Sequence, residues 1–144
     1  MTESINQENL AKIIIHLEWL RDNGCSYKFK MSHFLSYYRD SVKIAEANTI
    51  EDLEAQLYRM KAPISATECG TVGCIAGHIA LIGDCPKRHN VEEFAADWLG
   101  LSKAEADSIF YADWAGIYDD GVERELGDVT IDETIEYLKS LVIP

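Results

Sequence analysis

The chain has 144 residues, 47% of them hydrophobic, and a formal net charge of −12 at pH 7. Its length predicts one domain, residues 1–144, and no stretch approaches the roughly 20 apolar residues that cross a bilayer. The charge is uneven, with 11 acidic and 10 basic side chains in residues 1–90 but 14 and 3 in residues 91–144, so direct nucleic-acid binding is disfavoured.

A first helix is predicted between Ser4 and Gly24. Ser4 with Gln7 and Glu8 is typical of a helix start, and Gly24 can end the run. Five apolar residues recur between them at helical spacing: Leu10, Ile13, Ile14, Leu17 and Leu20. This periodicity predicts that one face of the helix is buried.

Two further helices are predicted before residue 64. Ser32 can cap a second helix, and Thr49 a third that Pro63 ends. The apolar positions of the second are Phe34, Leu35, Tyr38, Val42 and Ala45, and those of the third are Ile50, Leu53, Leu57 and Met60.

Residues 71–83 contain no Asp, Glu, Lys or Arg, in a chain of which 26% is charged. A helix that is apolar all round is normally buried all round, so this segment predicts a central buried helix. Gly73 and Gly77 would each cost about 1 kcal/mol relative to alanine in a helix interior. Their presence indicates that another backbone crosses close to this segment.

The last third of the chain predicts three helices with clear start signals. Asn90 with Glu93, Ser102 with Glu105, and Thr130 with Glu133 each have the spacing of a capping box. Residues 113–127 are acidic and rich in glycine, which is typical of a structured loop. The chain as a whole predicts an all-α single-domain bundle of about six to seven helices around the central helix at 71–83.

Cysteine and histidine side chains gather around that central segment. Cys74 and His78 are one helical turn apart, and Cys85 and His89 repeat the spacing. With Cys69 they could give zinc the four thiolate and imidazole ligands that it prefers, so Cys69, Cys74, His78 and Cys85 are the candidate metal ligands. The alternative is that the cysteines are buried thiols and that His78 is a hydrogen-bonded core residue, with no cofactor.

A second alternative is a cysteine-dependent enzyme. Cys69 or Cys74 would be the nucleophile near a helix start, with His78, His89 or His33 as the base. No Asn or Asp is an obvious third member of such a group. The Asp119-Asp120-Gly121 segment does not fit an EF-hand frame, and no phosphate-binding loop or dinucleotide fingerprint is present.

The acidic third of the chain also contains aromatic residues in its least regular segment. Exposed aromatic side chains flanked by acids are typical of a protein-binding surface. The predicted contact residues are Trp114, Tyr118, Asp119, Asp120, Glu123 and Glu125. Their charge favours a protein partner that is basic or that itself binds nucleic acid, whose backbone the acidic surface could mimic.

The N-terminus lacks the basic start and apolar run of a signal peptide, which predicts a cytoplasmic protein. In that compartment the four cysteines are expected to be reduced. The spacing of Gly73 and Gly77 suits a contact within one chain or between two, so the oligomeric state stays open.

Two motifs occur in order along the chain: Cys69-Gly70-Thr71-Val72-Gly73-Cys74-Ile75-Ala76-Gly77-His78, and then Trp98-Leu99-Gly100-Leu101-Ser102 with Phe110-Tyr111. Over roughly residues 69–114 the chain thereby resembles a group of small uncharacterised proteins of bacteria and phages. That group carries a Cys-Gly-Thr-x-x-Cys-x-Ala-Gly motif followed by a Leu-Gly-Leu helix pair. The resemblance implies a structural Cys-Gly-Thr turn, and a phage or mobile-element accessory protein that binds a host protein.

These observations favour a non-enzymatic acidic binding protein that modulates a host protein through its acidic C-terminal third. A small zinc-stabilised Cys/His module and a cysteine-dependent enzyme are the alternatives.

Overall fold

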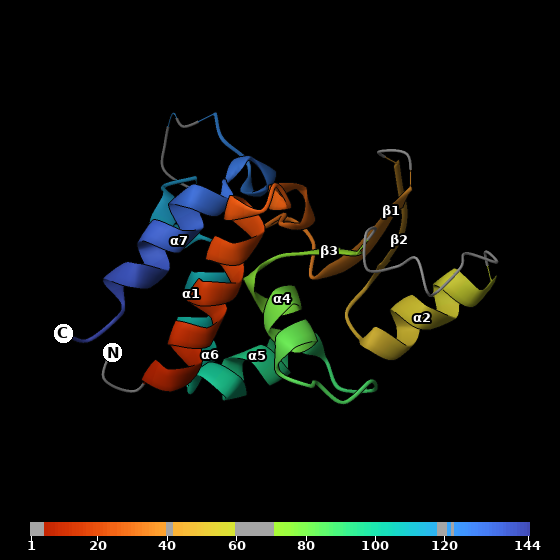
Figure 1. Cartoon of the computed structure of the whole chain (residues 1–144), viewed down its shortest axis with the longest axis horizontal. Coiled ribbons are helices and arrows are strands. Elements are labelled where there is room, and N and C mark those ends of the chain that lie inside the picture. The colour runs from red at the N-terminus through yellow and green to blue at the C-terminus, as the bar shows by residue number, and fades with distance from the viewer. Residues whose placement is uncertain (1–4, 40–41, 60–70, 118–120, 122) are drawn as a thin grey trace.

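The computed structural model describes residues 5–39, 42–59, 71–117, 121 and 123–144 (Figure 1). The described residues form a mainly helical fold that also contains a three-stranded antiparallel sheet in the order β2-β1-β3. The elements are α1 (Gln7–Asp22), β1 (Leu35–Arg39), β2 (Val42–Ala47), α2 (Ile50–Arg59), β3 (Thr71–Gly73), α4 (Ile75–Ile82), α5 (Val91–Leu99), α6 (Lys103–Phe110) and α7 (Ile131–Ser140). The prediction of a purely α-helical fold was therefore wrong.

The first helix, α1, has the predicted buried face. Its five periodic apolar residues are all buried, and the helix packs against α4, α5 and α7. The N-cap is Asn6, whose side-chain oxygen accepts a hydrogen bond from the backbone N–H of Asn9 at 3.0 Å. The observed N-cap is therefore two residues after the predicted cap at Ser4, which lies outside the described residues.

The segment predicted as a second helix is instead the antiparallel hairpin of β1 and β2. Alternate residues bury one face of this hairpin: Leu35, Tyr37, Ala45 and Ala47, which pack with Leu53 and Leu57 of α2. Period-two burial of this kind is a strand pattern, and it leaves the opposite face of the hairpin for polar side chains. Of the third predicted helix, α2 is present with Thr49 bonded to the N–H of Asp52 at 3.1 Å, whereas Met60 and Pro63 lie outside the described residues.

The central helix is shorter than predicted, because residues 71–73 form strand β3 and α4 begins at Ile75. The backbone N–H of Cys74 donates to the carbonyl of His33 at 2.7 Å, which fixes the end of β3 beside the chain that leads into β1. Residues 75–80 of α4 are all buried. The predicted close crossing is confirmed, since an added Cβ at Gly77 would lie 1.7 Å from the carbonyl oxygen of Phe34.

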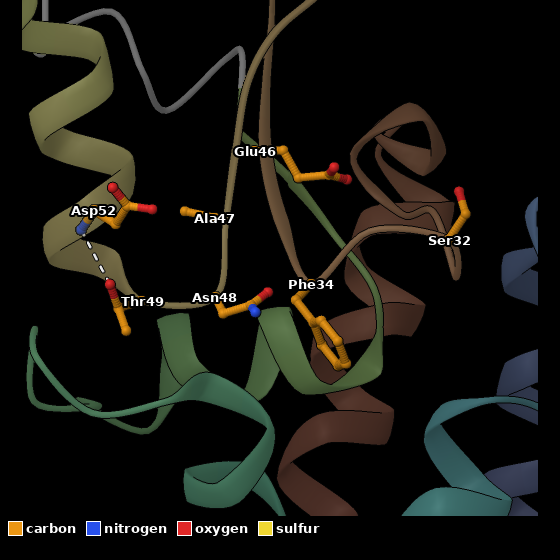
Figure 2. Close-up of a pocket in the computed structure, with 7 residues that line it drawn as sticks. All are labelled: Ser32, Phe34, Glu46, Ala47, Asn48, Thr49 and Asp52. Carbon is orange, nitrogen blue, oxygen red and sulfur yellow. Dashed lines mark hydrogen bonds between the residues drawn. The ribbon is translucent and has the colours of Figure 1, made fainter.

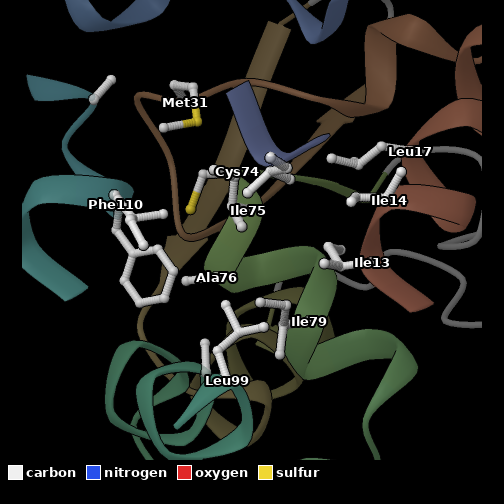
Figure 3. Packing of buried hydrophobic residues seen from close by; sticks show 14 of the residues in the cluster. Ile13, Ile14, Leu17, Met31, Cys74, Ile75, Ala76, Ile79, Leu99 and Phe110 are labelled. Carbon is white, nitrogen blue, oxygen red and sulfur yellow. The ribbon is translucent and has the colours of Figure 1, made fainter. Parts of the chain in front are cut away.

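The three C-terminal helices begin at the predicted caps. The Asn90 side chain bonds to the N–H of Glu93, while Ser102 with Glu105 and Thr130 with Glu133 form full capping boxes. Side chains of α1, α4, α5 and α6 meet in one hydrophobic core, which Figure 3 shows around Ile79, Leu99 and Phe110. Within the described residues, no helix combines the length and the apolar composition that a membrane span requires.

Candidate functional site

The described members of the predicted metal set do not converge on one point. Both ring nitrogens of His78 are hydrogen-bonded, Nε2 to the carbonyl oxygen of Lys28 at 2.7 Å and Nδ1 to His16 Nε2 at 3.0 Å. The thiol of Cys85 donates to the carbonyl oxygens of Pro86 and His89. Among the described residues, which exclude Cys69, no three His, Cys, Asp or Glu side chains form a group that could hold a metal ion.

The environment of Cys74 suppresses thiolate chemistry. Its side chain is 1% exposed, and burial raises the pKa of the thiol to about 11 against the weaker opposing effect of backbone N–H groups at the start of α4. At neutral pH this sulfur is a protonated thiol without access to solvent. Such a cysteine is chemically inert.

We therefore expect a maleimide to label Cys25 in the native protein well before Cys74 or Cys85. Cys25 is partly exposed, whereas the other two thiols are buried. Peptide mapping by mass spectrometry after timed quenching measures the order, and the urea-unfolded protein is the control in which the three thiols react together. Prior labelling of Cys74 would contradict this view and would support the cysteine-enzyme alternative.

The predicted aromatic and acidic contact surface is described only in part. Trp114 is partly buried, its ring stacks on Tyr137 at 4.4 Å between centroids, and its indole N–H donates to the carbonyl of Ile109 at 3.2 Å. This side chain is thus tied to α7 and the end of α6. Glu123 and Glu125 are exposed, and Tyr118, Asp119 and Asp120 lie outside the described residues.

A pocket of about 440 Å³, called the α5/α6 groove below, lies between α5 and α6. Gly100 ends α5 in the left-handed conformation, with φ of 72°, and the chain turns back at once into α6. One face of each helix therefore borders the same pocket. Its charged lining consists of Glu92, Glu93, Asp97, Asp107 and Lys103, and its apolar lining consists of Ala96, Leu101 and Ala106.

The charge of this α5/α6 groove is strongly negative. Among the described lining residues, Lys103 is the single lysine or arginine and lies 3.7 Å from Asp107, so the four carboxylates leave a balance of −3 with His89 counted as neutral. Within the described part of the chain, Glu93 and Asp97 have no basic side chain at ion-pair distance. The groove therefore offers carboxylates to a cation together with apolar surface for the stem that carries it.

A second polar cluster lies on the face of the hairpin opposite α2. Glu46 Oε2 is hydrogen-bonded to His33 Nδ1, and His33 Nε2 lies 3.1 Å from the hydroxyl of Tyr38. Lys43 holds the other carboxylate oxygen of Glu46 at 3.3 Å. Burial acts to raise the pKa of Glu46, but the hydrogen bonds from His33 and Lys43 outweigh it and lower that pKa.

This cluster borders a pocket of about 460 Å³ through Glu46. Figure 2 shows Glu46 and Ser32 on one side of the pocket, with Thr49 and Asp52, at the start of α2, on the other. Phe34, Ala47 and Asn48 complete the lining. The pocket is open and mainly polar, so it provides room beside the hairpin cluster.

Sequence reasoning missed both of these sites, although part of the signal was present. Glu93 and Asp97, like Lys103 and Asp107, are four residues apart and so share a helix face. From sequence, His33 was considered only as a candidate base for a cysteine. Glu46 and Tyr38 are brought together by a strand pairing that was not predicted. No protein-family model, curated protein or solved structure matches the chain.

Proposed function

We propose that the chain is a binding protein that takes a basic segment of a protein partner into the α5/α6 groove. The groove lies in the acidic C-terminal third, where the sequence predicted the binding surface. Such binding would suit an accessory protein of a phage or mobile element that modulates a host protein. The observation that carries the proposal is the described lining of the groove, in which four carboxylates and one lysine occur together with three apolar side chains.

The groove suits an arginine or lysine side chain better than a free cation. Aliphatic stems of such residues pack on apolar surface while their charged heads reach carboxylates. Ala96, Leu101 and Ala106 supply that surface, and Asp97 and Glu93 supply charge beside it. An exposed ion pair contributes only about 0 to 1 kcal/mol, so useful affinity requires several carboxylates acting together with the apolar lining.

The net charge of −12 adds long-range attraction for a basic partner. Such a field raises association rates and is screened within about 10 Å at 0.1 M salt. Binding should therefore weaken as salt is added, mainly through slower association.

We expect the double variant Glu93→Gln/Asp97→Asn to bind a short fluorescein-labelled peptide of alternating Arg and Ser about tenfold more weakly than the native protein, as measured by fluorescence anisotropy. Two lost charge contacts of up to about 1 kcal/mol each account for this factor. Both replacements leave the backbone N–H bond to Asn90 in place, so the melting temperature should change little.

The matched control is Glu123→Gln/Glu125→Gln, which changes the net charge by the same amount on the surface predicted from sequence. Retained binding by this control supports the groove. An equal loss in the two variants would show attraction to net charge alone, and a larger loss in the control would place the contact on that other surface; either result would overturn the groove proposal.

A further inference from the structure

The hydrogen bonds in the hairpin cluster have a defined direction. The lowered pKa of Glu46 keeps its carboxylate ionised, so that oxygen can only accept and His33 Nδ1 carries the proton. When the imidazole is neutral, the other nitrogen, Nε2, is an acceptor, and the Tyr38 hydroxyl 3.1 Å away can donate to it. Carboxylate, imidazole and hydroxyl therefore form one chain along which a proton can move from Tyr38 to His33.

The strands hold these three groups in place. Tyr38 pairs with Lys43 in the register of β1 and β2, and Ser36 pairs with Glu46, so Tyr38 and Glu46 project from the same face of the hairpin. His33 precedes β1, and its main chain is fixed by the bond from the N–H of Cys74 to its carbonyl. The imidazole thus sits between two groups that belong to paired strands.

Two lysines give this face a positive character. The ammonium of Lys30 lies over the Tyr38 ring, 5.0 Å from its centroid, and Lys43 bonds to Glu46. Positive charge stabilises a developing phenolate and the oxygens of a phosphoryl group in transfer. A hydroxyl with a hydrogen-bonded base, a group that orients the base, and adjacent cations is the arrangement of an activated nucleophile.

We propose that Tyr38 is a nucleophile that accepts a phosphoryl group from a phosphate ester, with His33 as its general base and Glu46 as a positioning residue. The Tyr38 Oη–P bond forms as the bond from phosphorus to the leaving oxygen breaks. The hydroxyl proton passes to His33 Nε2, and from there to the leaving oxygen or to solvent. This activity is separate from partner binding in the α5/α6 groove.

Other tyrosines of the protein serve as internal controls for the reactivity of Tyr38. Tyr27 and Tyr58 are 58% and 78% exposed, whereas Tyr38 is partly buried. Within the described residues, Tyr38 is the one tyrosine whose hydroxyl is hydrogen-bonded to an imidazole. If exposure alone governed reaction, Tyr58 would be modified first.

The test is reaction of the full-length protein with diethyl 4-nitrophenyl phosphate. Release of 4-nitrophenolate is followed by absorbance, and the modified residue is located by peptide mass spectrometry. We expect one equivalent of diethylphosphoryl group on Tyr38, and no reaction at Tyr38 in the Tyr38→Phe variant. Modification of Tyr58 or Tyr27 in preference to Tyr38 would overturn the proposal.

The role of the base is tested separately. His33→Ala should slow phosphorylation of Tyr38 by at least about 100-fold, the usual contribution of a general base, and added imidazole should restore part of the rate. Glu46→Gln should slow it by about tenfold and shift its pH profile, because the carboxylate no longer stabilises the imidazolium. Folding is verified by circular dichroism. Unchanged rates in folded His33→Ala and Glu46→Gln proteins would show that the cluster is only structural and holds the segment around His33 against the hairpin.

Discussion

Replacement of Gly77 by alanine is expected to destabilise the native fold severely. The new Cβ would lie 1.7 Å from the carbonyl oxygen of Phe34 and 2.9 Å from its carbonyl carbon, and both are backbone atoms that no rotamer change can move. Alanine gains about 1 kcal/mol in helix propensity, but relief of this clash requires α4 to separate from the chain entering β1. We expect a loss of at least about 3 kcal/mol, a large fraction of the 5 to 15 kcal/mol that stabilises a typical domain.

Urea denaturation followed by circular dichroism measures this effect, with two other glycines as graded controls. A Cβ at Gly73 would approach the Phe34 oxygen to 2.8 Å, so Gly73→Ala should be destabilising but less so. A Cβ at Gly127 would meet only the Ser32 side chain, at an ordinary 3.5 Å, so Gly127→Ala should lie within about 0.5 kcal/mol of the native protein. A native midpoint for Gly77→Ala would contradict the close crossing of α4.

The close crossing could be expected from sequence because glycine has few other uses inside an apolar helix. The C-terminal helices were equally accessible, because their start signals are local: Ser102 bonds to Glu105 and Thr130 to Glu133, three residues away in each case. What the glycines could not indicate is which backbone crosses there, since Phe34 is more than 40 residues from Gly77.

The hairpin was not predicted because, over a short stretch, its apolar residues fit the periodicity of a helix as well as that of a strand. Leu35 and Tyr38 are three apart, as on a helix face, yet Leu35 and Tyr37 are the buried pair. The choice between the two is made by the register of β1 with β2 and β3, which joins Leu35 to Ala47 and to Gly73. Such pairing is not encoded within a window of ten residues.

For the candidate sites too, local spacing can be read from the sequence but long-range contacts cannot. The acidic groove follows from four-residue spacings on α5 and α6, which sequence displays. The spacing of Cys74 and His78 is equally regular, but the side chain of His78 is bonded to His16, 62 residues away, and to the main chain at Lys28. In the structure His78 is a buried residue, 2% exposed, with both ring nitrogens hydrogen-bonded.

The pairing of His78 with His16 fixes the tautomers of both rings. A carbonyl oxygen can only accept, so His78 Nε2 donates to Lys28 and the neutral ring has an acceptor at Nδ1. His16 Nε2 must then donate to it. A proton added to His78 Nδ1 would point at that donor and break the bond, so the folded chain holds His78 neutral.

Acid should therefore destabilise the protein through His78. Burial, together with the charges of His16 and Lys28, lowers the His78 pKa from its usual 6.5 to about 4, despite the opposing hydrogen bond to Lys28. Between these two pH values the unfolded chain takes up a proton that the folded chain does not, so stability falls as pH falls through this window. The contribution approaches about 3 kcal/mol near pH 4, at about 1.4 kcal/mol per pKa unit, and is absent above pH 6.5.

Urea unfolding at a series of pH values from 7 to 4, on the native protein and the variant His78→Gln, isolates this contribution. The glutamine amide can donate to Lys28 and accept from His16 but does not titrate, and the acidic side chains act alike in the two proteins and cancel in the difference. We expect the variant to be the less stable protein at pH 7, where its packing is imperfect, and to lose less stability than the native protein as the pH falls. Parallel curves would mean that His78 titrates alike in the folded and unfolded chains. That result would contradict the prediction, which rests on the burial of His78 where α4 packs on α1 and on its two hydrogen bonds.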